Sequence, residues 1–154
     1  MGSPLTWVIV KTDTRKEAFV AGQVVNLGFD CWVPCQLIAT RPHAARKVTA
    51  KAMVSIKELP ILPKRIFARM DWHEAGALRG IRHLQDVERD GEERIVAIPD
   101  SQIAAFKAEI DRENTAALAL AQKASRRQKA KWRSLKDALL ELVDSAKRQM
   151  EIAA

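Results

Sequence analysis

The last 44 residues of the chain contain neither glycine nor proline, and no other feature constrains the fold as much. They are rich in Ala, Leu, Lys, Arg and Gln, which all favour helix. We expect the chain from about Ser101 to Met150 to be mainly helical, as one long helix or as two that join near Asn114 and Thr115. Apolar residues at three- and four-residue spacing form a stripe that predicts packing against the rest of the chain or against a partner helix. The stripe comprises Trp132, Leu135, Leu139, Leu142, Ala146 and Met150.

Basic residues concentrate in the same stretch. Residues 111–154 carry 10 Lys and Arg against 6 Asp and Glu, whereas residues 1–110 carry 16 against 13. Between Lys123 and Lys136 there are seven basic residues and no acidic one. This pattern fits a solvated helical face or a nucleic-acid contact, and Trp132 within it fits a packing residue or a base-stacking one. The candidate nucleic-acid-binding residues are Arg15, Lys16, Lys123, Arg126, Arg127, Lys129, Lys131 and Arg133.

The first 110 residues alternate short β-branched and aromatic runs with turn signals. Asp13 or Thr14 can cap a first helix that Gly28 ends, and Asp71 can cap a second one. This order predicts an α+β fold in which helices pack on a mainly antiparallel sheet. The expected strands are Trp7–Lys11, Phe29–Val33, Arg65–Met70, Ile81–Val87 and Ile95–Ile98. The expected helices are Arg15–Leu27, Trp72–Arg79 and one from Asp100 onward, with a hairpin or flexible loop over residues 37–57. The expected domains are residues 1–110 and a helical tail, residues 111–154.

Residues suited to catalysis or metal binding are scattered. The phosphate-loop, dinucleotide-binding, zinc-protease and serine-hydrolase motifs are all missing, and the three histidines lie in different segments. The carboxylates of Glu88, Asp90, Glu92 and Glu93 fit a hydrated turn. We therefore expect no enzyme, no cofactor and no metal site.

The cysteines and the hydropathy pattern point to a cytoplasmic protein. Cys31 and Cys35 are too far apart on a strand for a disulfide, so we expect two reduced thiols. The longest uncharged stretch, Cys31–Thr40, is about half of what a membrane span requires, and the N-terminus does not resemble a signal peptide.

Six segments, in order, resemble the N-terminal domain of the NusG/RfaH transcription elongation factors. Each segment alone is weak, but their order and spacing make the resemblance specific, and together they span about two thirds of the chain. They are Trp7–Val10 (WVIV), Arg15–Glu17 (RKE), Gly28–Pro34 (GFDCWVP), Pro60–Met70 (PILPKRIFARM), Arg79–Ile81 (RGI) and Ile98–Asp100 (IPD).

The resemblance implies a monomeric domain with a four-stranded, mainly antiparallel sheet. It also implies docking on the clamp helices of the largest subunit of RNA polymerase, and a second contact on the opposite side of the cleft. Upstream or non-template DNA, or nascent RNA, would be a further partner. The implied docking surface is an exposed apolar patch centred on the proline-bounded segment, Pro60–Arg65 (PILPKR). The candidate polymerase-binding residues are Ile61, Leu62, Arg65, Phe67, Trp72, His73 and Arg79.

Three departures from the family pattern qualify these expectations. Arg65 stands where the family usually has tyrosine, which suits stacking or pairing with an acidic clamp residue. The basic helical tail replaces the usual KOW barrel, so ribosome or Rho contacts are not expected. Phe19, Asn26 and Leu27 stand where the RfaH branch has base-reading residues.

Three functions remain open at this point. The first is an elongation or antitermination factor, for which the single-domain architecture suggests a phage or plasmid origin. The second is a polymerase inhibitor that competes with the host factor, and the third is a free nucleic-acid-binding module.

Overall fold

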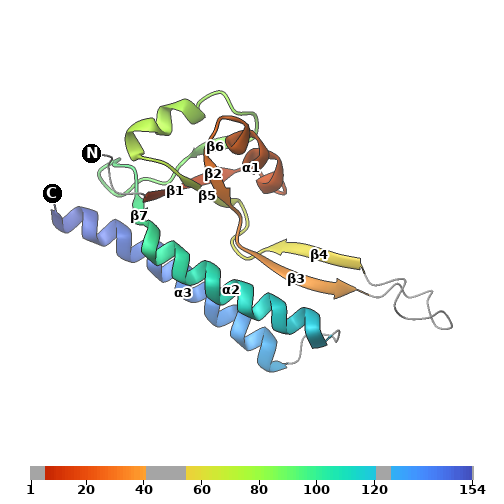
Figure 1. The fold of residues 1–154 in the computed structure, drawn as a ribbon. Coiled ribbons are helices and arrows are strands. Elements are labelled where there is room, and N and C mark those ends of the chain that lie inside the picture. Colours follow the sequence, from red (N-terminus) through yellow and green to blue (C-terminus); the bar gives the residue numbers. More distant parts are fainter. Residues whose placement is uncertain (1–5, 41–54, 121–125, 154) are drawn as a thin grey trace.

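The computed structural model describes residues 6–40, 55–120 and 126–153 (Figure 1). In chain order its elements are β1 (Thr6–Thr12), α1 (Glu17–Asn26), β2 (Asp30–Trp32), β3 (Cys35–Thr40), β4 (Ser55–Pro60), β5 (Arg65–Arg69), the 3-10 helix η1 (Trp72–Leu78), β6 (Leu84–Val87), β7 (Ala97–Pro99), α2 (Asp100–Leu120) and α3 (Arg126–Ala153). The expected α+β fold is confirmed.

β1 lies at the centre of the main sheet. It pairs with β5 on one side, and β2 continues the sheet beyond β5. On its other side β1 pairs with β6 along Val10–Thr12 and with β7 along Thr6–Val8, so these two short strands lie end to end. All of these pairings are antiparallel. The expected four-stranded sheet therefore has five strands, because β7 pairs with the half of β1 that β6 leaves unpaired.

The two faces of the sheet hold separate hydrophobic cores. Side chains alternate along a strand, so Val8 and Val10 of β1 point to the face covered by α1 and η1. Trp7 and Ile9 point to the opposite face, where they pack with Ile103 of α2 and with residues of α3. Every one of these β1 side chains is at most 3% exposed. The sheet is thus the middle layer of three.

The first helix begins differently from the expectation. Lys16 is its N-terminal flanking residue and its side chain makes no capping hydrogen bond. Asp13 instead accepts a hydrogen bond from Gln85 of β6, at 2.9 Å, and pairs with His83, at 3.0 Å, so it ties the end of β1 to β6 and to the residue before it. The predicted stop at Gly28 is confirmed, because Gly28 adopts φ +94° after the last turn. Asp71 caps η1 as expected, since it accepts the backbone N–H of His73.

A second, two-stranded sheet projects from the body (Figure 1). β3 and β4 pair from Cys35↔Pro60 to Thr40↔Ser55, so the hairpin alternative for residues 37–57 is confirmed for its described strands. Residues 41–54 lie outside the described part of the chain.

The C-terminal region forms two antiparallel helices. α2 runs through Asn114 and Thr115, where a joint between helices was one of the expectations, and continues to Leu120. α3 returns beside it (Figure 1), with Trp132 and Leu135 packed on Ile110. The predicted domain boundary after Ile110 falls inside α2.

Candidate functional site

The proline-bounded segment assigned to polymerase docking is mostly buried. Ile61, Leu62 and Phe67 keep only 8%, 2% and 0% of their surface exposed. Leu62 and Phe67 belong to the same core as Leu139 and Val143 of α3. The expectation of an exposed apolar patch at these residues is therefore wrong, because α3 of the same chain covers it.

α3 supplies the cover through its apolar stripe. Its buried residues recur at three- and four-residue spacing, as expected, and Leu142 and Met150 are partly buried beside them. Trp132 is 7% exposed and packs with Ile61 and Ile110, so the packing alternative holds for it. The stripe thus packs against the chain's own sheet and not against a partner helix. The buried set is Trp132, Leu135, Leu139, Val143 and Ala146.

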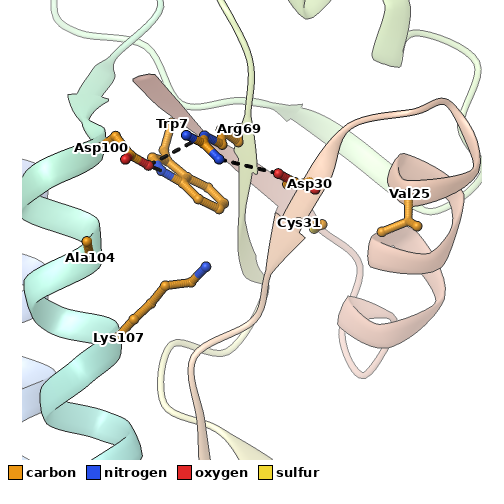
Figure 2. Close-up of a pocket in the computed structure, with 8 residues that line it drawn as sticks. All are labelled: Trp7, Val25, Asp30, Cys31, Arg69, Asp100, Ala104 and Lys107. Carbon is orange, nitrogen blue, oxygen red and sulfur yellow. Dashed lines mark hydrogen bonds and ion pairs between the residues drawn. The ribbon is translucent and has the colours of Figure 1, made fainter. Parts of the chain in front are cut away.

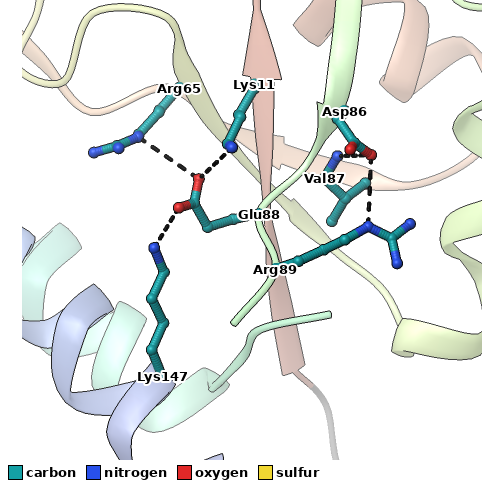
Figure 3. Close-up of polar contacts among 7 residues, drawn as sticks. All are labelled: Lys11, Arg65, Asp86, Val87, Glu88, Arg89 and Lys147. Carbon is teal, nitrogen blue, oxygen red and sulfur yellow. Dashed lines mark hydrogen bonds and ion pairs between the residues drawn. The ribbon is translucent and has the colours of Figure 1, made fainter. Parts of the chain in front are cut away.

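A buried carboxylate fixes α3 to the sheet near the C-terminal end of the helix (Figure 3). Glu88, which follows β6, is 4% exposed and accepts a hydrogen bond from the ammonium of Lys147 in α3. Its second oxygen lies 3.6 Å from Nζ of Lys11 and 4.0 Å from Nε of Arg65. Arg65 therefore pairs with a carboxylate of its own chain. Glu88 was expected in a hydrated turn, and burial under α3 overturns that expectation.

The charges around Glu88 set its protonation. Burial acts to raise the pKa of Glu88, but the hydrogen bond and charge of Lys147, with Lys11 and Arg65 behind it, outweigh burial and hold the pKa below its usual value. The carboxylate is thus ionised at neutral pH, and it neutralises part of a local group of three cations.

The remaining candidate polymerase contacts lie on the surface. Trp72 is 50% exposed, and its ring stacks on that of His73 with 3.6 Å between centroids. His73 is held in turn by Asp71, whose Oδ1 lies 2.7 Å from its Nδ1. Arg79, at the end of η1, is exposed. Trp72 and His73 thus form an exposed aromatic pair at the start of η1, and Arg79 adds an exposed guanidinium just after its end.

The candidate nucleic-acid residues do not gather in one place. Arg15 and Lys16 are exposed in the turn before α1. Lys131 and Arg133 are exposed on α3, and Nζ of Lys131 lies 3.1 Å from Glu109 of α2. Arg126, Arg127 and Lys129 belong to the first turn of α3, and Lys123 lies outside the described residues. The turn before α1 and the helix α3 thus carry separate groups of cations.

A cavity of about 320 Å³ opens beside β2, between α1 and α2 (Figure 2). The indole N–H of Trp7 donates to Asp100 at 2.8 Å, and Arg69 lies 3.5 Å from both Asp100 and Asp30. Nζ of Lys107 lies 4.6 Å from the centroid of the Trp7 ring, a cation–π contact. The charges that line the cavity are balanced, two of each sign.

The two cysteines are free thiols, as expected. Burial raises the pKa of Cys31 to about 12 and that of Cys35 to about 11, so both stay protonated at neutral pH. Within the described ranges, no group of three metal-ligating side chains comes together. In the same part of the chain, no helix is long and apolar enough to cross a membrane.

Sequence reasoning missed two polar contacts. Glu88 and Asp90, which is 6% exposed, stand in one run of carboxylates, and nothing in that run distinguishes these two buried acids from the exposed Glu92 and Glu93. Asn114 was treated as a possible helix joint, yet it is 9% exposed and bonds to β3. A polar residue on the apolar side of an otherwise regular helix was the available signal.

Fold and surface together define a small α+β domain whose central antiparallel sheet is covered by helices on both faces. A family model described as "Transcription termination factor nusG" matches residues 5–107. The chain therefore belongs to the NusG family of transcription factors, as its sequence motifs predicted. The match includes β1 to β7 and ends within α2, before α3. No curated protein matches the chain.

Proposed function

We propose that the chain is a NusG-like factor that binds RNA polymerase in the elongation complex and promotes processive elongation or antitermination. The observation that supports this most is the family match over residues 5–107, which includes the whole main sheet. Domains of this family interact with RNA polymerase. The function proposed is one of binding and not of catalysis.

The proposed contact with polymerase uses the surface of η1. Trp72, His73 and Arg79 are exposed and combine an aromatic pair with a guanidinium. Tryptophan and arginine are enriched among the residues that carry most of the binding energy in protein interfaces. Leu62 and Phe67 are occupied by α3, so their contact with the clamp helices would require α3 to leave the sheet.

The excess of positive charge supports a second contact, with nucleic acid. The net charge is +7, and exposed cations lie in the turn before α1 (Arg15 and Lys16) and on α3 (Arg133). Upstream or non-template DNA, or the nascent transcript, is the polyanion that an elongation factor meets. The proposal is therefore of a monomeric cytoplasmic factor that reaches the nucleoid with polymerase.

In vitro transcription through an intrinsic terminator and through a Rho-dependent one tests this function. The proposal expects greater read-through with the protein than without it. Equal docking with slower elongation in a single-round assay would indicate an inhibitor that competes with the host factor. A folded protein that alters neither elongation nor termination contradicts the proposal.

A further inference from the structure

Glu88 faces more positive charge than it can neutralise. Lys147 of α3, Lys11 of β1 and Arg65 of β5 all lie within 4.0 Å of its carboxylate. This Glu88 cluster of four side chains holds three positive charges and one negative charge, so its net charge is +2. Oε2, the oxygen nearest to Lys11 and Arg65, is buried and accepts no hydrogen bond from the described part of the chain.

Two of the cations are direct neighbours across the main sheet. β1 and β5 pair with Lys11 opposite Arg65, and like charges in that position destabilise a sheet. Neither side chain donates a hydrogen bond to another described residue. Figure 3 shows that the terminal nitrogens of Arg65 point away from Glu88. A pair that breaks a local rule of sheet stability in this way is expected at a functional site.

The cations of the cluster are accessible, whereas its carboxylate is not. The side chains of Lys11, Arg65 and Lys147 are 42%, 33% and 27% exposed, and that of Glu88 is 5% exposed. An anion from solvent can therefore reach the donors of Lys11 and Arg65 while Glu88 stays bonded to Lys147.

The charges next to the cluster leave its excess in place. Asp86, the register partner of Lys11 on β6, accepts the backbone N–H of Val87 and lies 3.8 Å from Nε of Arg89. Lys64 and Asp144, which are both exposed, adjoin the cluster in sequence and add one charge of each sign. The net charge of +2 is therefore available to a ligand.

We infer that the Glu88 cluster is a binding site for a phosphate group, supplied by a nucleotide or by a nucleic-acid strand. A guanidinium presents a planar fork of donors and an ammonium a compact charge, and both recur as phosphate ligands. A phosphate monoester carries about −1.5 to −2 at pH 7, which matches the cluster, and two successive backbone phosphates of a strand carry the same charge. One carboxylate would balance only half of it.

This site is separate from the proposed contact with polymerase. Lys11 alternates with Val10 along β1, so it lies on the face of the sheet that α3 covers, opposite to α1 and η1. The inference thus adds a second binding site to the domain, on its other face.

Titration of the full ¹⁵N-labelled chain with inorganic phosphate at constant ionic strength, followed by NMR, tests the site. The variant combines Lys11→Gln with Arg65→Gln. The matched control combines Arg82→Gln with Arg112→Gln, two exposed cations that form no ion pair with another described residue. We expect phosphate affinity to fall about tenfold or more in the site variant and to stay unchanged in the control. Thermal melting checks that both variants are folded.

Glu88→Gln tests the charge balance in the opposite direction. The amide oxygen still accepts a hydrogen bond from Lys147, but the negative charge that competes with the ligand is gone. We expect phosphate to bind several-fold more tightly to the folded variant. A purely structural role of Glu88 would not raise the affinity, and an equal or lower affinity would overturn the inference.

Anisotropy titrations with single-stranded and duplex DNA over a range of salt concentrations identify the source of the phosphate. A strand as the source predicts that the site variant lowers the salt slope by roughly 0.7 to 1.8 more than the control does. A nucleotide as the source predicts equal slopes, with the loss of inorganic phosphate binding retained.

Two results would overturn the phosphate site. One is equal binding of acetate and phosphate at the same ionic strength, and the other is an equal effect of the site variant and its control on phosphate affinity. None of these assays contains polymerase, so failure of this site is distinguishable from failure of the proposed function.

Discussion

At the residue scale, Glu88 joins three elements that are distant in the sequence. Lys147 comes from α3, Lys11 from β1 and Arg65 from β5, and all three face one buried carboxylate (Figure 3). Removal of one partner from a buried charge group costs more than loss of an exposed ion pair, because the remaining charges stay desolvated. Glu88 therefore stabilises the packing of α3 on the sheet.

The pH dependence of stability should report this carboxylate. The pKa of Glu88 is held below its ordinary value of 4.5 in the folded protein, so Glu88 contributes stability above that value. The contribution is lost as the pH falls through the folded pKa. We expect Glu88→Gln to lower the free energy of unfolding at pH 7 and to flatten its decrease between about pH 5 and pH 3.

Chemical denaturation at a series of pH values measures this effect. Asp137→Asn, which alters an exposed carboxylate on α3, is the control and should keep the parent's dependence on pH. The pKa values of Asp13 and Glu141 are also held low, by hydrogen bonds from Gln85 and Arg148, so some dependence should remain in Glu88→Gln. An unchanged profile in Glu88→Gln would show that the carboxylate is not paired in solution.

The exposed aromatic pair of η1 allows a second prediction at this scale. Trp72→Ala removes a side chain that is 50% exposed, so we expect a change in stability within about 0.5 kcal/mol. Its loss should weaken binding to RNA polymerase about tenfold or more, as for an aromatic residue at the centre of an interface. Val25→Ala, at a residue 55% exposed on α1, is the control. Equal polymerase affinity of both variants would place the interface elsewhere.

At the scale of elements, α3 is a structural layer of the domain. Its stripe buries Leu139 completely, between sheet and helix. Each large aliphatic side chain buried in this way contributes about 1.5 to 3 kcal/mol. We expect Leu139→Ala to lower the free energy of unfolding by about 2 to 5 kcal/mol, and the partly buried Leu142→Ala to lower it by less.

The same variant tests what α3 does at the proposed interface. If polymerase contacts the surface of η1, weaker packing of α3 should leave binding unchanged for the folded fraction of Leu139→Ala. Tighter binding would mean that the face beneath α3, with Leu62 and Phe67, is the docking surface and that α3 competes for it. A titration of core polymerase with labelled protein separates the two results.

The elements were more predictable than their contacts. β-branched runs bounded by turn residues placed β1 and β5 within two residues, and the three- and four-residue spacing located the buried face of α3. The same spacing does not indicate which surface packs against that face. Leu62 was therefore expected to be exposed, although α3 of the same chain buries it.

The candidate site was less predictable, for a related reason. The positions of Trp72 and Arg79 at the two ends of a short helix could be predicted from turn and helix signals. The hydrogen bonds of Glu88 to Lys147 and of Asn114 to β3 span more than 50 residues of sequence, and short motifs do not encode them. Residues assigned by resemblance also reflect the family's architecture, and here α3 follows the matched region and covers part of it.

At the scale of the whole molecule, the question is whether residues 111–154 are a separate domain. α2 crosses the predicted boundary, and α3 buries Leu62 and Phe67. A chain that ends after Lys123 would expose both faces of that contact to water. We expect it to lose cooperative thermal unfolding, measured by circular dichroism, while the parent keeps it. Retention of the parent's melting transition would show that the chain folds without α3.

The most direct test of the central claim is binding to core RNA polymerase at low salt. Size-exclusion chromatography of the folded protein with core enzyme measures it, and Trp72→Ala provides the comparison. The account predicts that the protein elutes with polymerase and that Trp72→Ala reduces the bound fraction. A folded protein that elutes entirely apart from polymerase would contradict the account.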